Sequence, residues 1–176
     1  MRRRRFLEIS ALSGAALAWP LPLRAAADTG ERSLILRNLH TGERERLVYR
    51  PGEVLPPELQ SAVNTLLRDH RNGDVHPIDP DLLDLLQTTA AACGAAADFT
   101  VLSGYRSPAT NEALRRAGRS VAKNSFHLTG RAVDVRLAGV DLERLRRAAR
   151  ALHRGGVGHY PGPGFVHLDT GPFRTW

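Results

Sequence analysis

The stretch that decides the fold spans residues 125–134 and reads Ser125-Phe126-His127-Leu128-Thr129-Gly130-Arg131-Ala132-Val133-Asp134. Its second half begins a predicted central strand, Arg131 to Leu137, that carries Asp134 inward. A second stretch, Gly164-Phe165-Val166-His167-Leu168-Asp169, contains the start of the last predicted strand, Phe165 to Thr170. We expect this last strand to bring His167 beside Asp134.

Two histidines and one aspartate in these stretches form a candidate metal site. His127, Asp134 and His167 are the donor set of an open zinc site, which leaves a fourth position for water or substrate. Zinc held in this way lowers the pKa of its water from about 15.7 to roughly 7 and polarises a carbonyl group, so the set indicates metal-assisted hydrolysis. The alternative for the same spacing is a capping Asp134 with two hydrogen-bonded histidines.

The flanking residues predict an α+β domain. Alternating residues at 33–38 and 44–50 around the turn 40–43 predict an N-terminal β-hairpin, and residues 99–102 predict a short strand. Helices are expected from Pro56 to about His70, from about Asp79 to Cys93, and over 108–117 and 141–153. We therefore expect a small, mainly antiparallel sheet that carries the zinc site, with helices packed on one side.

Several motifs in this order resemble a known family. They are Ser-Gly-Tyr-Arg-Ser-Pro at 103–108, the stretch 124–134, Gly-Gly-Val-Gly at 155–158 and His-Leu-Asp-Thr-Gly-Pro at 167–172. Together they resemble the zinc D-Ala-D-Ala carboxypeptidase family, most closely its murein endopeptidase K branch, a twin-arginine-exported group. The resemblance covers nearly the whole chain after residue 27. It implies that His127, Asp134 and His167 ligate zinc.

The resemblance also implies that Arg106 faces the substrate carbonyl or carboxylate. A fixed cation at that place is worth several kcal/mol toward a developing oxyanion in a dry site. The alternative is a surface arginine that stabilises a turn. Ser125 either hydrogen-bonds within the site or shapes the turn before His127.

The general base departs from the family pattern. Carboxypeptidases of this family place an acidic base three residues before the last histidine ligand, where this chain has Gly164. Asp169 is one candidate, because residues two apart on a strand face the same way. It could equally accept the other ring proton of His167 and fix its tautomer. His159, on the glycine-rich approach, is a third possibility.

The N-terminus predicts export. Arg3-Arg4-Arg5-Phe6-Leu7 fits the twin-arginine pattern, an apolar stretch follows from Ile9 to Leu23, and Ala25-Ala26-Ala27 offers a cleavage site. We expect residues 1–27 to be a signal peptide and 28–176 a single metallopeptidase domain, exported or periplasmic. A retained membrane anchor is the alternative, but about 15 apolar residues broken by two prolines fall short of a spanning helix.

Charge and cysteine content exclude other classes. The chain carries +7, but residues 1–27 hold five arginines and one glutamate, so the remaining 149 residues carry only +3. Without a basic stripe and interleaved aromatics, nucleic-acid binding is not expected. Cys93 is the only cysteine and is expected to be a small core residue, so neither an intramolecular disulfide nor a cysteine-rich zinc knuckle can form.

The sequence therefore predicts an exported, Zn²⁺-dependent murein hydrolase. Its partners would be peptidoglycan stem peptides, and its reaction the cleavage of crosslinks between them. Two alternatives stay open: a non-catalytic module that binds cell-wall peptides, and a zinc D,D-carboxypeptidase that trims terminal D-alanine.

Overall fold

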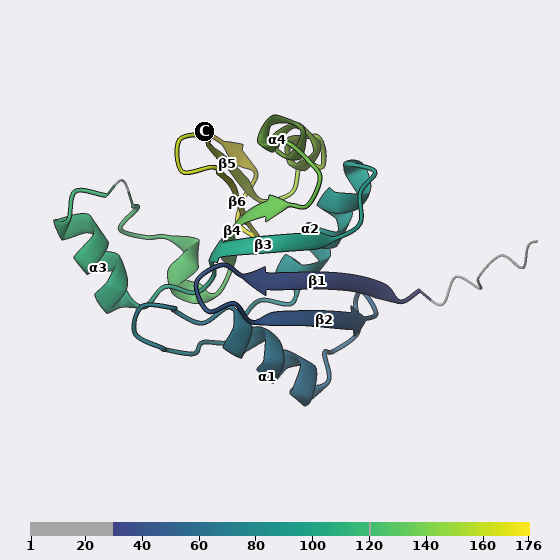
Figure 1. Ribbon diagram of the computed structural model, residues 1–176, viewed down its shortest axis with the longest axis horizontal. Coiled ribbons are helices and arrows are strands. Elements are labelled where there is room, and N and C mark those ends of the chain that lie inside the picture. The colour runs from purple at the N-terminus through teal and green to yellow at the C-terminus, as the bar shows by residue number, and fades with distance from the viewer. Residues whose placement is uncertain (1–29, 120) are drawn as a thin grey trace, which may run out of the picture.

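A seven-stranded mixed sheet runs through the protein, whose computed structural model describes residues 30–119 and 121–176. The strands are β1 (Arg32–Asn38), β2 (Arg44–Tyr49), β3 (Asp98–Ser103), β4 (Ala132–Leu137), β5 (Gly156–Tyr160), β6 (Phe165–Asp169) and β7 (Arg174–Thr175). Their order in the sheet is β2-β1-β3-β4-β6-β5-β7 (Figure 1). The pairs β1–β3 and β5–β7 are parallel, whereas the other described pairs are antiparallel. The predicted signal peptide lies outside the described residues.

Four helices and one short 3-10 helix complete the domain, which confirms the predicted α+β class. They are α1 (Pro57–Leu66), α2 (Asp81–Ala92), α3 (Pro108–Arg116), α4 (Leu142–Ala151) and the 3-10 helix η1 (Phe126–Thr129). Within the described part of the chain, no helix has the length and apolar character needed to cross a bilayer.

The first helix ends at Leu66, so its predicted extension to His70 is wrong. The carbonyl of Leu67 accepts a hydrogen bond from Tyr105 N at 2.7 Å, outside the helix. The following turn is closed by Gly73 N, which donates to Asp69 O at 2.8 Å. The spacing of apolar residues favours a longer helix, but the hydrogen bond from Tyr105 to Leu67 coincides with its end.

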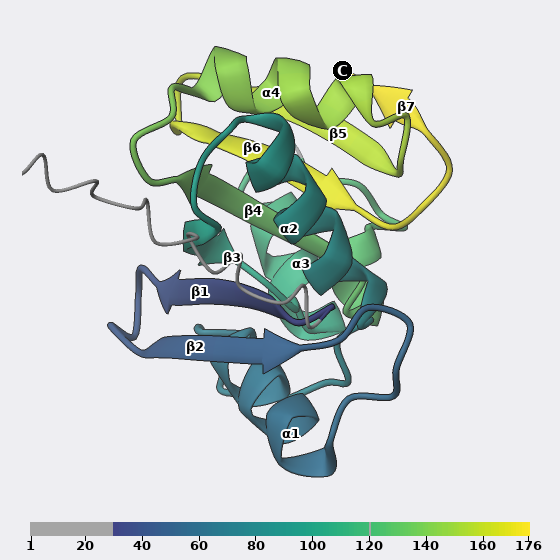
Figure 2. The same ribbon diagram turned by 90° about the vertical axis from the view of Figure 1, so that its right-hand side faces the viewer.

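The core lies between one face of the sheet and the helices. Figure 2 shows α2 and α4 lying across this face, and α1 packs beside β1 and β2. Alternate strand residues such as Leu36, Phe99, Val135 and Leu168 are fully buried there. Because side chains alternate along a strand, their neighbours point to the opposite face.

That opposite face carries the polar residues of interest. In the register of β4 and β6, Asp134 lies directly across from His167, while Val135 lies across from Val166. Strand alternation therefore places a polar pair on one face and an apolar pair on the other. The helix α3 projects beyond one end of the sheet, next to η1 (Figure 1).

Candidate functional site

The 3-10 helix η1 positions the third member of the polar cluster, His127. Ser125 caps this helix: its side chain accepts a hydrogen bond from His127 N at 3.3 Å. The helix ends at Gly130, whose φ of 67° is left-handed, and a Cβ at this position would lie 2.2 Å from Pro77 O. Glycine is therefore required for the turn that leads from His127 into β4.

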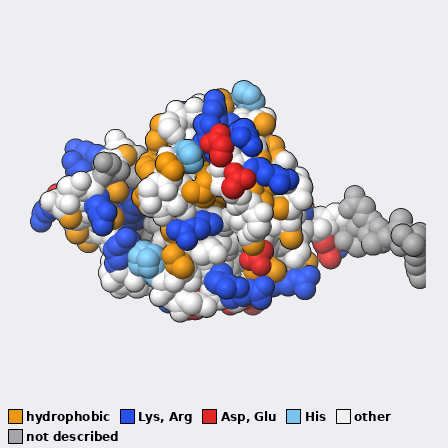
Figure 3. All heavy atoms as spheres, turned by 45° about the horizontal axis from the view of Figure 1, so that its top comes forward, with side chains coloured by type: hydrophobic (Ala, Val, Ile, Leu, Met, Phe, Trp, Pro, Cys, Tyr) orange, Lys and Arg blue, Asp and Glu red, His pale blue; other side chains and the backbone are white. Residues whose placement is uncertain are grey.

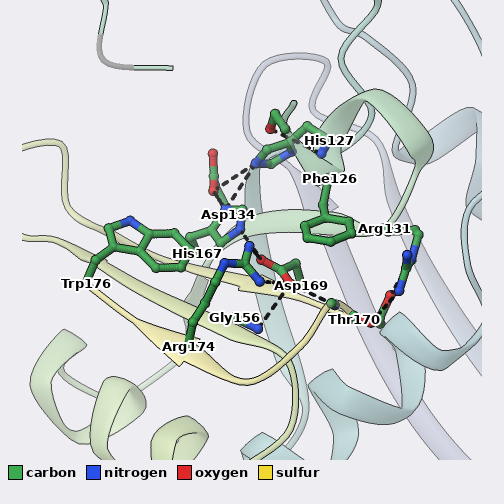
Figure 4. A network of polar contacts seen from close by, with 12 residues as sticks. Phe126, His127, Arg131, Asp134, Gly156, His167, Asp169, Thr170, Arg174 and Trp176 are labelled. Atoms are coloured by element: carbon green, nitrogen blue, oxygen red, sulfur yellow. Dashed lines mark hydrogen bonds and ion pairs between the residues drawn. The ribbon is translucent and has the colours of Figure 1, made fainter. Parts of the chain in front are cut away.

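The three sequence-predicted donors converge. His127 Nε2 lies 3.2 Å from His167 Nδ1 and 3.3 Å from Asp134 Oδ1, and His167 Nδ1 lies 2.8 Å from the same oxygen (Figure 4). All three residues are buried. Zinc bonds of about 2.0–2.2 Å place the donors of a tetrahedral site about 3.3 Å apart, so these atoms fit a zinc ion.

Hydrogen bonds fix the orientation of both imidazoles. His127 Nδ1 donates to the carbonyl of Gly104 at 2.6 Å, which leaves the lone pair of Nε2 facing the cluster. His167 Nε2 donates to Asp169 Oδ2 at 3.0 Å, which leaves Nδ1 facing Asp134. Each ring thus presents one nitrogen to the shared centre, as a metal ligand must.

Charge and burial act against each other in this cluster. Burial lowers the pKa of His127. Burial alone would raise the pKa of Asp134, but the adjacent His127 and His167 hold it well below its usual range. Burial would also lower the pKa of His167, yet hydrogen bonds to Asp134 and Asp169 raise it. Asp134 is therefore a carboxylate at neutral pH, the form that binds a cation.

Arg106 lies at the edge of this centre and is only 7% exposed. Its Nη2 is 4.0 Å from Asp134 Oδ2, and its Nη1 donates to Asn111 Oδ1 at 3.3 Å. Its Nε is buried and has no hydrogen-bond partner among the described residues. Burial lowers the pKa of this guanidinium. Arg106 is also one of the residues that line the pocket above the cluster.

Asp69, which the sequence analysis did not single out, supports the loop of Arg106. Its carboxylate accepts hydrogen bonds from Ser107 N and Ser107 Oγ, both at 2.9 Å, and from Arg71 N at 3.0 Å. Asp69 is fully buried. Its position inside the predicted helix that ends near His70 gave no local signal for this role, because Ser107 is far away in sequence.

The cluster lies in a pocket of about 140 Å³. Its described lining residues are Arg106, Val121, Ala122, Asn124, Ser125, Phe126, His127, Asp134, Tyr160, Phe165, His167, Arg174 and Trp176. Asp134 is the one carboxylate among these lining residues. The pocket therefore combines a cation-binding cluster and a buried guanidinium with aromatic walls.

Asp169 lies behind His167 and not in the pocket. It is fully buried, and its oxygens accept hydrogen bonds from His167, Gly156 N, Gly171 N and Arg174. Burial would raise its pKa, but hydrogen bonds from His167 and Arg174 hold it below the usual range. This geometry suits support of the imidazole and leaves no oxygen to take a proton in the pocket.

His159 is not brought to the site. In the register of β5 and β6, Gly158 pairs with His167 and His159 pairs with Val166, so the side chain of His159 points to the face covered by α4. Its Nδ1 lies 4.0 Å from Glu143 of that helix. His159, the third possibility for the general base, is therefore not beside the cluster, because residues 156–160 form a strand whose alternation turns this ring away.

Gly164 occupies the turn between β5 and β6. Its φ of 76° is left-handed, and its amide donates to Tyr160 O at 2.9 Å. A Cβ there would lie 3.0 Å from Arg136 Nη2. The turn thus accounts physically for glycine at the position where carboxypeptidases of the family have their acid.

Comparison with known proteins agrees with this geometry. A family model described as Peptidase_M15_2, peptidoglycan L,D-endopeptidase MepK, matches residues 25–176. The probable peptidoglycan L,D-endopeptidase MepK of Haemophilus influenzae is 38% identical over 176 residues, which cover 99% of this chain and 95% of that protein. The Escherichia coli K12 peptidoglycan L,D-endopeptidase MepK is 39% identical over 175 residues, covering 99% and 96%.

Among solved structures, the Serratia marcescens L-Ala D-Glu endopeptidase ChiX matches 63% of this chain and 86% of its own, with 26% identity and a TM-score of 0.39. That overlap is too partial to support a comparison of folds. The convergent donor set and the full-length relatives define the class: the protein is a metallopeptidase, a hydrolase. Within that class, the chain belongs to the peptidoglycan L,D-endopeptidase MepK family. The predicted family branch is therefore confirmed.

Proposed function

We propose that the protein is an exported, zinc-dependent endopeptidase that hydrolyses stem-peptide crosslinks in peptidoglycan. The observation that carries this proposal is the convergence of three donor atoms from His127, Asp134 and His167 beneath a pocket that also holds Arg106. Membership of the MepK family supports the substrate class, because the relatives are described as peptidoglycan L,D-endopeptidases.

His127, Asp134 and His167 would hold the zinc ion, since each faces the shared centre with one donor atom. Bound there, zinc supplies Lewis acidity, lowering the pKa of a water molecule to about 7 and polarising the scissile carbonyl. The protein contributes a fixed donor geometry. It also contributes burial, which strengthens electrostatic interactions inside the site.

Arg106 would stabilise the oxyanion that develops on the carbonyl. Its guanidinium is held in place by Asn111 and by the Asp69–Ser107 contact behind its loop, and it lines the pocket. Donors that are fixed before the reaction need no reorganisation when charge develops. Asp169 would hold His167 in the ligand tautomer.

The surroundings of the pocket suit an anionic substrate. Figure 3 shows basic side chains gathered on the lobe formed by α3 and the segment after it. Arg115, Arg116, Arg119 and Lys123 are exposed there, and the adjoining Val121, Ala122 and Asn124 line the pocket. Stem peptides carry free carboxylates, so this basic lobe would attract them at the mouth of the site.

Digestion of purified peptidoglycan tests the proposal. We expect the zinc-loaded protein to convert crosslinked muropeptides to monomers, and we expect His127→Ala, which removes one donor, to leave them intact. Unchanged muropeptides with zinc-loaded wild-type protein, or full activity in His127→Ala, would exclude the proposed mechanism.

The same digestion separates the two alternatives. A D,D-carboxypeptidase would release free alanine while the crosslinked dimers persist. A non-catalytic module would sediment with peptidoglycan without changing its products. The absence of a second carboxylate among the described lining residues is the observation that favours the binding module.

A further inference from the structure

The strand β7 and the residue after it bring Arg174 and Trp176 to the back of the site. β7 pairs with β5 in parallel, with Gly156 opposite Arg174. The Arg174 guanidinium forms a bidentate pair with Asp169, with Nη1–Oδ1 at 3.1 Å and Nη2–Oδ2 at 2.6 Å. Neither Arg174 nor Trp176 was singled out by the sequence analysis.

Arg174 and His167 share one carboxylate oxygen. Asp169 Oδ2 accepts from both Arg174 Nη2 and His167 Nε2, whereas Oδ1 accepts from Gly156 N at 3.1 Å and Gly171 N at 2.8 Å. The result is a continuous chain of contacts from Arg174 through Asp169 to His167 (Figure 4). The carboxylate has no freedom to turn without breaking several of these bonds.

The guanidinium of Arg174 is itself held from several sides. It lies 5.0 Å from the ring centroid of Phe126 and 5.1 Å from that of Trp176. Trp176 is anchored by Nε1, which donates to Tyr160 OH at 2.7 Å, and its ring lies 5.3 Å from that of His167.

Two glycines of β5 make this close packing possible. A Cβ on Gly156 would lie 2.3 Å from Asp169 Oδ2 and 2.8 Å from Arg174 Nη1. A Cβ on Gly158 would lie 2.7 Å from the indole of Trp176. The Gly-Gly-Val-Gly motif at 155–158 thus leaves space for Arg174 and Trp176, which line the pocket.

We propose that Arg174 is a positioning residue for the metal centre, acting through Asp169 to keep His167 turned with Nδ1 toward Asp134. Without the guanidinium, the buried Asp169 carboxylate would lose its charged partner, and an unpaired buried charge is unfavourable. Asp169 would then turn away from its present position, and His167 would lose its fixed orientation. This inference rests on the proposed zinc site.

Metal binding by the full chain tests the inference directly. Zinc affinity is measured for the metal-free protein by competition with a chromophoric chelator, and the geometry of the site by the visible absorption of bound Co²⁺. We expect Arg174→Met to lower zinc affinity by about 10- to 100-fold and to change the Co²⁺ spectrum. Arg174→Lys, which keeps the charge but loses the bidentate geometry, should recover part of the affinity.

The matched control is Arg146→Met, which removes the same charge from α4, where Arg146 pairs with Glu143. It should bind zinc like the wild type. If Arg174→Met does not fold when metal-free, Arg174→Gln and Arg174→Lys decide: lowered affinity in either supports the role, and wild-type affinity in both overturns it.

Failure of this inference can be told from failure of the proposed function. A wild-type chain that binds neither zinc nor cobalt overturns both. A wild-type chain that binds zinc, with a folded Arg174→Met that matches it in affinity and Co²⁺ spectrum, overturns the role of Arg174 alone.

Discussion

The two faces of β6 serve different purposes, although they belong to the same five residues. Val166 and Leu168 point to the helices and are fully buried among apolar side chains. His167 and Asp169 point the other way, into a network of hydrogen bonds. On the first face, stability depends on how well apolar side chains fill the core. On the second face, it depends on the geometry of hydrogen bonds and on the pairing of charges.

Adjacent residues of β6 can therefore affect mainly stability or mainly activity. An apolar contact is non-directional, so its loss costs free energy in proportion to the space left empty. A buried cluster of polar groups around a cation site is costly to form, because these groups lose their contacts with water. We therefore expect its residues to matter mainly for metal binding and catalysis. A substitution on the polar face should therefore lower activity more than stability, and a substitution on the apolar face should lower stability more than activity.

The largest expected effect comes from His167→Ala on the polar face. Removing one of the three donors should reduce peptidoglycan hydrolysis at least about 1000-fold, equivalent to about 4 kcal/mol of transition-state stabilisation. The metal-free variant should still fold and should lose less stability than Leu168→Ala. Muropeptide release measures the activity, and circular dichroism measures the thermal unfolding. A variant that keeps its activity would contradict the proposed role of His167 as a metal ligand.

The neighbouring substitution, Leu168→Ala, should show the reverse. Emptying this fully buried position should lower the free energy of unfolding by about 2–5 kcal/mol. Zinc affinity of the folded variant should equal that of the wild type. Denaturant unfolding and chelator competition measure both quantities, and a large loss of zinc affinity in folded Leu168→Ala would mean that the faces are coupled.

Arg106→Met tests whether residues of the site can affect catalysis without affecting metal binding. We expect kcat to fall about 100-fold, or about 2.7 kcal/mol, because a fixed donor for the oxyanion is lost. Zinc affinity should change little, since Arg106 contacts Asp134 only at 4.0 Å. Kinetics with a defined crosslinked muropeptide, together with metal titration, separate this role from that of a ligand. An unchanged kcat would contradict it.

Lowering the pH should destabilise the protein in part through protonation of Asp69. Burial would raise the pKa of Asp69, but hydrogen bonds from Thr110 and Ser107 lower it, so its stabilising contribution is complete above the unfolded value of about 4. That contribution is lost as the pH falls through the lower folded value. Asp69→Asn should therefore destabilise the protein by about 1–3 kcal/mol at pH 7. The difference from wild type should shrink below about pH 4. Melting temperatures across this range test the sign, and a constant difference would contradict it.

The smallest effect is expected for His159→Ala. Its ring points toward α4, and its contact with Glu143 at 4.0 Å is a half-exposed ion pair of little value. We expect kcat/KM to change by less than about twofold, since such contacts contribute little. A fall as large as that of Arg106→Met would return His159 to the catalytic machinery.

Local patterns were enough to predict part of this molecule. Alternation along β4 and β6 placed Asp134 and His167 on one face, and the donor chemistry singled out His127. Long-range contacts escaped the sequence analysis. The parallel pairing of β1 with β3, the buried Asp69 under the loop of Arg106, and the Arg174–Asp169 pair all join residues that no local period relates.

The errors have a similar origin. His159 lies away from the site because its glycine-rich stretch forms β5, in which Gly156 and Gly158 pack against Arg174 and Trp176. The first helix is shorter than predicted because the carbonyl of Leu67 accepts a hydrogen bond from Tyr105. In both cases the deciding interaction comes from a part of the chain far from the residue concerned.

The left-handed conformation of Gly164 disfavours an acidic side chain at this position. Introducing glutamate at that single position would strain the backbone by about 1–2 kcal/mol, because the new side chain disfavours this conformation. It would also bring the carboxylate close to Arg136. An acid at this position would therefore cost folding free energy and would contact a cation, Arg136, on the hairpin side of the sheet.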